Sequence, residues 1–175
     1  MVNVFAIFAN QGNRTEPIYV LEVSDQSGNS LKSSQTQATN IISPETAFLI
    51  SDVLQDVVRR GTGWRARALG RPSAGKTGTT NDNLDAWYIG FIPQLLTGVY
   101  VGFDQPRSMG LHESGSRAAA PIWVEFMKNA EANLPTQQFP QPPGIVSVKI
   151  HQSGRRAGPC DLQEEIREEH YKTGT

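Results

Sequence analysis

The residues best suited to chemistry lie in one short stretch, Lys76-Thr77-Gly78-Thr79-Thr80. A lysine supplies positive charge, and the threonine hydroxyls can donate hydrogen bonds to a substrate carboxylate. Glycine lets a ligand's backbone approach closely, because no side chain stands in the way. The amide of Thr79 can stabilise the negative oxygen that develops during acyl transfer. The stretch therefore predicts a strand that binds a carboxylate-ended peptide along its edge.

The same lysine also completes a phosphate-binding pattern. Residues 70–77 match GxxxxGK[ST] at every fixed position, and this pattern binds nucleotide phosphates between a buried strand and a helix. Before it, residues 64–69 carry two alternating arginines, which a strand buried on both faces does not tolerate. After it, residues 78–83 are β-branched and turn residues that begin a helix poorly. A nucleotide-binding P-loop therefore stays only as an alternative.

Composition excludes several other classes of function. The chain has 175 residues, with 16 Lys+Arg against 17 Asp+Glu and a net charge of −1. Near-neutrality argues against nucleic-acid binding through a broad basic face, and against attraction to an anionic membrane. The single Cys160 excludes an intrachain disulfide and a cysteine-rich zinc site. The three scattered histidines form no metal-binding pattern, so no metal is expected.

The first sixty residues predict a helix, a strand hairpin and a second helix. Residues 1–12 are expected to form a buried helix without the basic flank of a signal peptide, and no apolar run is long enough for a membrane span. Residues 17–23 predict a strand that turns and returns, and 33–40 a loop. Ser43 caps the next helix, which stops at Gly61. Its apolar face repeats with helical spacing: Ile50, Val53, Leu54, Val57 and Val58.

The middle of the chain predicts a sheet. Strands are expected over 74–80, 86–92 and 95–103. The last two are separated by only two turn residues, so they must run antiparallel. Asp85 and Trp87 are expected to hold this strand pair together rather than to touch a substrate.

The last third predicts one more helix and a polar tail. Pro121 begins the helix, and one side of it is apolar: Ile122, Trp123, Phe126, Met127 and Ala130. Residues 134–144 are a Pro/Gln linker, and 145–150 predict a short strand. The acidic segment that follows is expected to be a solvated arm.

A much longer string than the triplet carries a family resemblance. Residues 74–104, AGKTGTTNDNLDAWYIGFIPQLLTGVYVGFD, closely resemble the region around the Lys-Thr-Gly motif of class A (bifunctional) penicillin-binding proteins. FAIFANQG and SPETAFLISDVLQDVVRRGTG are similar to the stretch that leads into this motif. SGSRAAAPIWVEFM resembles the family's final helix, and PPGIVSVKI and REEHYKTGT resemble its tail. The resemblance covers nearly the whole chain.

The resemblance implies a fold and an activity. The expected fold is α+β, an antiparallel sheet with flanking helices that forms part of the penicillin-binding-protein and β-lactamase fold. The implied activity is a peptidoglycan D,D-transpeptidase, which joins stem peptides ending in D-Ala-D-Ala through a serine ester and binds β-lactams without a cofactor. Lys76 and the oxyanion amide of Thr79 would serve catalysis. The substrate would be bound by Lys76, Thr77, Gly78, Thr79 and Thr80.

The chain departs from the family pattern at two motifs. Family enzymes carry a Ser-x-x-Lys nucleophile motif and a Ser-x-Asn motif before Lys-Thr-Gly. Ser73 to Lys76 formally reads SxxK, but it uses the lysine of Lys-Thr-Gly, and one lysine cannot fill both roles. Ser27 to Asn29 formally reads SxN, but it lies in a predicted turn. The chain is therefore expected to be the C-terminal part of a transpeptidase domain, without its nucleophile and inactive alone.

This interpretation fixes the remaining expectations. Residues 1–133 would be the C-terminal portion of the transpeptidase domain, and 134–175 a linker and tail. The parent enzyme would act on the periplasmic side of the inner membrane, with no membrane contact by this fragment, and an exposed sheet edge would favour a homodimer. Three alternatives remain open: a D,D-carboxypeptidase or β-lactamase relative, a non-catalytic module that binds carboxylate-ended peptides, and the P-loop protein.

Overall fold

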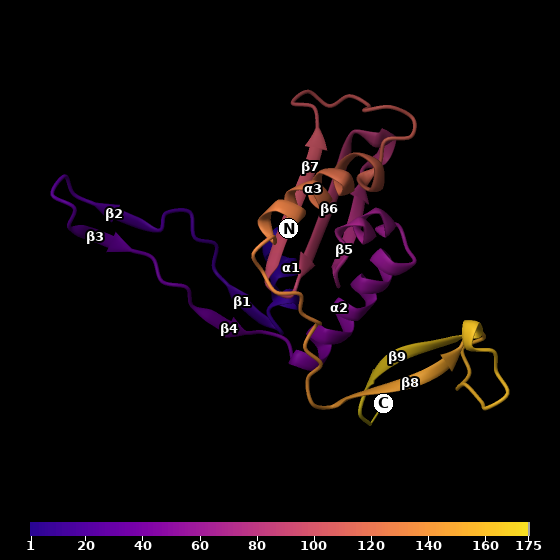
Figure 1. Ribbon diagram of the computed structural model, residues 1–175. Coiled ribbons are helices and arrows are strands. Elements are labelled where there is room, and N and C mark those ends of the chain that lie inside the picture. Colours follow the sequence, from indigo (N-terminus) through magenta and orange to yellow (C-terminus); the bar gives the residue numbers. More distant parts are fainter. Residues whose placement is uncertain (175) are drawn as a thin grey trace.

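A three-stranded antiparallel sheet organises the computed structural model, which describes residues 1–174. β6 (Asp85–Ile92) lies in the centre, between β5 (Ala74–Thr79) and β7 (Leu95–Gly102) (Figure 1). A short 3₁₀ turn, η2 (Asn81–Asn83), joins β5 to β6. The three predicted strands, their antiparallel pairing and the α+β class are confirmed. A homodimer through a sheet edge stays a prediction.

One face of the sheet is covered by three helical segments. These are the 3₁₀ helix η1 (Trp64–Leu69), the π-helix η3 (Gly115–Ala119) and α3 (Ala120–Ala130). Trp123 is fully buried and donates its Nε1–H to the carbonyl of Gly90, 3.2 Å away. A Cβ on Gly90 would lie 2.9 Å from the indole ring, so this residue must be glycine for α3 to pack this closely.

Two helices cover the opposite face. α1 (Val2–Ala9) and α2 (Pro44–Arg59) pack on Phe91 and Ala74 through Phe5, Phe8 and Leu54. The prediction that the first helix is buried is wrong, because no residue of α1 is buried and only one side of it meets the sheet. None of the helices within residues 1–174 combines the length and the apolar character needed to cross a bilayer.

The predicted boundaries of α2 are confirmed, but its predicted apolar face is only partly correct. Ser43 caps the helix by accepting a hydrogen bond from the amide of Thr46. The buried positions are Ala47, Phe48, Ser51, Leu54, Gln55 and Val58, while Ile50 and Val53 are exposed. Ser51 faces α1 and donates its hydroxyl to the carbonyl of Phe8, so a polar residue is satisfied within the buried stripe. In α3, likewise, Val124 is buried while Ile122 and Phe126 are exposed.

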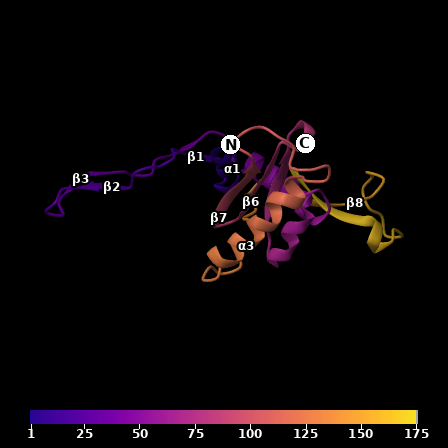
Figure 2. The ribbon, with the colours of Figure 1, turned by 90° about the horizontal axis from the view of Figure 1, so that it is seen from above.

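A long arm projects from the body of the molecule. Its base is β1 (Asn13–Thr15) paired with β4 (Ala38–Asn40), and its tip is β2 (Glu22–Ser24) paired with β3 (Ser30–Ser33). Figures 1 and 2 show β2 and β3 standing away from every helix and from the central sheet. The predicted hairpin is therefore present, but its first strand is shorter than predicted, and the predicted loop contains β4.

The tail forms a second hairpin rather than a solvated arm. After a linker without helix or strand, β8 (Ile145–His151) pairs with β9 (Ile166–Lys172), which follows the 3₁₀ turn η4 (Gln163–Glu165). The prediction for the tail was wrong because β9 is rich in charged residues and shows no apolar alternation. His170 anchors β9 to α2: its Nδ1 lies 2.8 Å from the carboxylate of Asp52, and its ring packs edge-on against Phe48.

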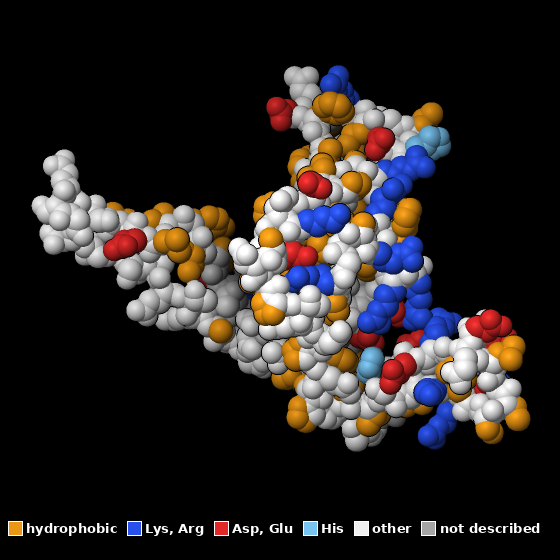
Figure 3. Space-filling view, in the orientation of Figure 1, with side chains coloured by type: hydrophobic (Ala, Val, Ile, Leu, Met, Phe, Trp, Pro, Cys, Tyr) orange, Lys and Arg blue, Asp and Glu red, His pale blue; other side chains and the backbone are white. Residues whose placement is uncertain are grey.

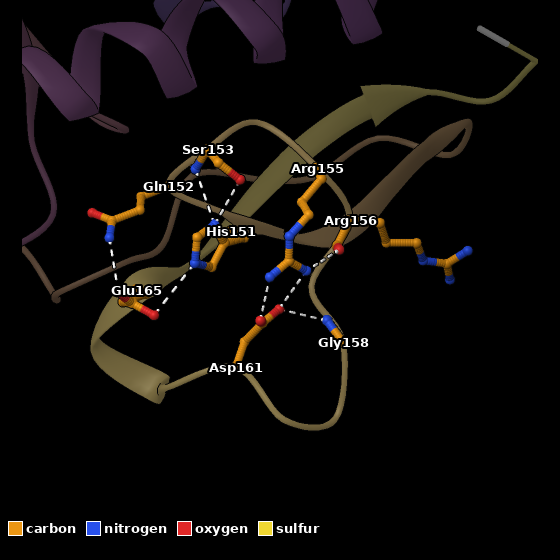
Figure 4. A network of polar contacts seen from close by, with 8 residues as sticks. All are labelled: His151, Gln152, Ser153, Arg155, Arg156, Gly158, Asp161 and Glu165. Atoms are coloured by element: carbon orange, nitrogen blue, oxygen red, sulfur yellow. Dashed lines mark hydrogen bonds and ion pairs between the residues drawn. The ribbon is translucent and has the colours of Figure 1, made fainter.

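Polar contacts close the turn of this second hairpin (Figure 4). The guanidinium of Arg155 holds the carboxylate of Asp161 with two hydrogen bonds, and the amide of Gly158 donates a third over 2.7 Å. His151 accepts from the amide of Ser153 at Nδ1, so its Nε2 is the nitrogen that can donate to Glu165, 3.3 Å away. The hydrogen bond from Arg155 is the main reason that the pKa of Asp161 falls to about 2.

Lowering the pH should weaken this turn in a defined window. Because the pKa of Asp161 is lower in the folded chain than its usual value of 3.8, its stabilising effect is complete above pH 4 and is lost as the pH falls towards 2. We expect a carboxyl NMR titration to give a midpoint near pH 2, and Arg155→Met to raise it towards 3.8. Arg156→Met is the control, since that side chain points away in Figure 4. An unchanged midpoint in Arg155→Met would contradict this assignment.

Truncating the central tryptophan should be costly. Trp123→Ala removes a fully buried indole and its hydrogen bond to Gly90, so we expect the free energy of unfolding to fall by about 3–5 kcal/mol. Urea denaturation measures this change. The matched control is Ile122→Ala, the adjacent residue with a side chain 51% exposed, which should cost less than about 1 kcal/mol. Equal losses in the two variants would contradict the packing described.

Candidate functional site

The predicted binding stretch lies on β5, the edge strand of the sheet. The amide of Thr80 donates to the carbonyl of Asp85 over 3.0 Å, continuing the β5–β6 ladder. Backbone groups of successive residues point to alternate edges of a strand. Lys76, Gly78 and Thr80 therefore bond towards β6, whereas the amides and carbonyls of Thr77 and Thr79 face the outer edge. No strand among residues 1–174 pairs with that edge.

Lysine and threonine side chains surround this open edge. Lys76 is exposed, and its ammonium donates to the carbonyl of Thr77 over 2.7 Å. The hydroxyl of Thr77 lies 2.8 Å from that of Thr62, in the turn after α2. The hydroxyl of Thr79 accepts a hydrogen bond from the amide of Gly115 at 3.0 Å. The edge thus offers one cation and two unpaired backbone amides, with both hydroxyls held in place.

A contact between glycines fixes η3 against this strand. A Cβ on Gly115 would lie 2.3 Å from the carbonyl oxygen of Trp87 and 2.6 Å from that of Gly78. The start of η3 therefore touches the β5–β6 backbone directly, which is how its first amide reaches Thr79. Gly115 was not among the residues that the sequence predicted for the site. The sequence did carry a signal for it: Gly115 begins a segment rich in small residues, and such a glycine indicates that another backbone approaches closely.

The far end of β6 is held by an aromatic and carboxylate cluster. Tyr100 on β7 donates its hydroxyl to Asp85 over 2.6 Å, and its ring lies 4.9 Å from that of Trp87. The hydrogen bond to Asp85 is the main reason that the pKa of the Tyr100 phenol is raised. These contacts confirm that Asp85 and Trp87 hold the strand pair together.

The geometry does not fit the nucleotide-binding alternative. Residues 64–69 form a 3₁₀ helix rather than a strand, and β5 runs straight through Lys76 and Thr77 with no helix after it. The serines of the two formal motif matches, Ser73 of SxxK and Ser27 of SxN, also lie away from the open edge. Ser73 is buried just before β5, and Ser27 lies in the turn at the tip of the arm, next to Gly28 with its positive φ of 83°. Within the described part of the chain, no three His, Cys, Asp or Glu side chains are grouped to hold a metal ion.

Comparisons with known proteins agree with this geometry. Residues 1–128 match the family model of the penicillin binding protein transpeptidase domain. Penicillin-binding protein 1A of Aquifex aeolicus is 40% identical over 148 residues, which are 84% of this chain and 20% of that protein. The Pseudomonas aeruginosa protein of the same name is 48% identical over 126 residues, 71% of this chain and 15% of that protein. The chain thus spans a fifth or less of these curated relatives.

A solved structure extends the likeness to the tail. The crystal structure of penicillin-binding protein 1A from Haemophilus influenzae superposes with a TM-score of 0.89 and 29% sequence identity. The superposition covers 99% of this chain and 31% of that one. It therefore includes the arm and the β8–β9 hairpin as well as the central sheet.

Adding a methyl group at the η3–β5 contact should disturb the site. Gly115→Ala places a carbon where the carbonyl oxygens of Trp87 and Gly78 leave no room, so η3 must move. We expect the free energy of unfolding to fall by about 1–3 kcal/mol, together with a large shift of the Thr79 amide resonance. Ser116→Ala, one residue later, is the control and should leave that resonance in place. A Gly115→Ala variant with unchanged stability and spectrum would show that the contact is looser than described.

Proposed function

The chain belongs to the penicillin-binding protein transpeptidase family, and we propose that it supplies the substrate-binding strand of a class A, peptidoglycan cross-linking member. The reaction would be serine acyl transfer on stem peptides that end in D-Ala-D-Ala, and β-lactams would bind at the same place. One observation carries the proposal: β5 keeps an open edge with the exposed Lys76 beside it. An edge of this kind accepts an extended peptide as an additional strand.

The edge suggests how a peptide would be held. The peptide backbone would pair with the amides and carbonyls of Thr77 and Thr79. To meet the terminal carboxylate, the ammonium of Lys76 would exchange the Thr77 carbonyl for the carboxylate, a stronger charge-assisted partner. The Thr77 hydroxyl, now shared with Thr62, could donate to the same carboxylate. Gly78 would let the peptide approach closely, and the backbone of Gly78 and Thr80 would keep β5 paired with β6.

The amide of Thr79 would serve the chemical step. A serine oxygen would attack the carbonyl of the penultimate residue, and the carbonyl oxygen would become an oxyanion. An amide that points out of the open edge can stabilise this charge without rearranging. The terminal D-Ala then leaves with its nitrogen protonated, and the amine of a second stem peptide displaces the serine from the ester. With water in place of that amine, the same edge would serve a D,D-carboxypeptidase or a β-lactamase, so the choice of acceptor lies outside β5.

The remaining proposals follow from family membership. Residues 1–133 would be the transpeptidase portion, and 134–175 would follow as linker and tail. The parent enzyme would work on the outer side of the cytoplasmic membrane without a cofactor. Neither Ser73 nor Ser27 stands beside the open edge, so we propose that this chain alone forms no acyl-enzyme.

Labelling with a fluorescent penicillin tests the proposal in two settings. The isolated chain should show no covalent band, because neither of its two formal motif serines, Ser73 and Ser27, stands beside the open edge. A chimaera in which this chain replaces the matched region of the Pseudomonas aeruginosa relative should be labelled, because β5 would then meet that protein's own nucleophile. Lys76→Ala in the chimaera should slow acylation by about 100-fold, the scale of losing one electrostatic contact to the reacting group.

The controls separate recognition from folding. Lys128→Ala, an exposed lysine on α3, should leave the labelling rate unchanged. A covalent adduct on the isolated chain would refute its proposed inactivity. A folded Lys76→Ala chimaera that acylates at the original rate would refute the role of β5.

A further inference from the structure

A run of basic residues without acidic ones leads into the open edge. Residues 57–81 hold six Lys and Arg side chains and no Asp or Glu, although the whole chain has a net charge of −1. The run includes the end of α2, all of η1 and all of β5. Figure 3 shows Lys and Arg side chains gathered in a column along the side of the molecule where α2 lies. Unbalanced charge of this extent acts on any ionic ligand that approaches β5.

Half of these cations keep their charge uncancelled. Three of the six pair with nearby carboxylates, namely Arg59, Arg60 and Arg71. The other three have no carboxylate within 4.0 Å among residues 1–174: Arg65, Arg67 and Lys76. Lys76 is the cation already proposed to meet a carboxylate, so the two arginines of η1 are the ones that remain without a role.

The two guanidiniums of η1 flank an exposed indole. Trp64 is 47% exposed. The guanidinium carbon of Arg65 lies 4.6 Å from the centre of the indole ring, and that of Arg67 lies 5.8 Å from it. Arg67 is fixed further because its Nε donates to the carbonyl of Trp64 over 3.2 Å. The three side chains thus form one ordered cationic surface, which we call the Trp64 platform.

The Trp64 platform lies next to the place where a terminal carboxylate would bind. The hydroxyl of Thr62 lies 2.8 Å from that of Thr77. Only two residues, at most about 7 Å of chain, lead from Thr62 to Trp64. The platform therefore adjoins the Thr77 end of the open edge, whereas the oxyanion would form at the amide of Thr79. It would meet a ligand at its carboxylate and take no part in bond breaking.

We propose that Arg65 and Arg67 attract and select ligands that end in a free carboxylate, before Lys76 and Thr77 bind that group. This role rests on the function proposed above and adds to it two residues outside the Lys-Thr-Gly stretch. Exposed cations that act at a distance raise the rate of encounter with an anion and change the bound complex little. Arg65 and Arg67 are accordingly steering residues and not catalytic ones.

The salt dependence of acylation tests this role on the full-length chimaera already described. At an ionic strength of about 10 mM, charges act over about 30 Å. There Arg67→Glu should lower the second-order rate constant of acylation by a penicillin about fivefold. At about 1 M salt the range falls to about 3 Å, and the variant and the parent chimaera should react equally fast. The first-order rate constant at saturating penicillin should stay unchanged, because the reacting groups are untouched.

Two control variants separate steering from folding. Lys32→Glu makes the same change of charge in β3, which stands away from every helix (Figure 1), and should leave the rate unchanged. Arg67→Lys keeps the charge and should keep both the rate and its salt dependence. A loss of rate in Arg67→Glu that persists at high salt would overturn the proposal, since it would report a damaged site. An unchanged rate at low salt would overturn it as well.

An NMR titration of the isolated chain gives a second measurement that needs no acylation. N-acetyl-D-Ala-D-Ala should shift the resonances of the Trp64 indole and the Thr77 amide, and the same dipeptide with a C-terminal amide should not. Arg67→Glu should weaken the binding of the carboxylate form several-fold. Equal shifts with both dipeptides, or none with either, would overturn the proposal. A chimaera that is not labelled, although the titration distinguishes the dipeptides, would refute only the proposed function.

Discussion

The pairing of β6 on both of its edges is the interaction on which the rest of the structure depends. With β5 on one side and β7 on the other, β6 is the only strand of its sheet with no free edge. Both of its faces are also covered, by Tyr88 packing against Trp123 on one and by Phe91 packing against the α1–α2 side on the other. β5 is therefore held along one edge by β6, and its other edge is open.

Two contacts fix the positions of the threonine hydroxyls on β5. The turn after α2 reaches the hydroxyl of Thr77 through Thr62, and the start of η3 reaches the hydroxyl of Thr79 through the amide of Gly115. The two contacts come from segments far apart in the chain. A binding edge whose donors are fixed before the ligand arrives loses less entropy on binding. The glycine at 115 allows this arrangement, because a Cβ there would collide with the backbone oxygens of Trp87 and Gly78.

The sequence predicted those parts whose pattern is set locally. β6 and β7 were found because a buried strand pair joined by a two-residue turn leaves few alternatives, and Lys76 was placed by the motif around it. The buried stripe of α2 could not be predicted in the same way, since Ser51 lies in the contact with α1, where its hydroxyl donates to the carbonyl of Phe8. β9 shows no apolar alternation, and its pairing with β8 depends on backbone groups that composition does not reveal. The open edge itself is a property of topology.

The position of α2 explains how the tail and the binding strand can share one element without depending on each other. Its middle holds the tail through Asp52 and Phe48, which contact His170. The turn after its other end holds β5 through Thr62. Between these points, Leu54 and Val58 bury α2 against the sheet side of the molecule. These two residues contact neither β8 nor β9 in the core clusters, although Phe139 of the linker packs against the cluster of Leu54. The packing that positions β5 would therefore persist if the hairpin of β8 and β9 moved away.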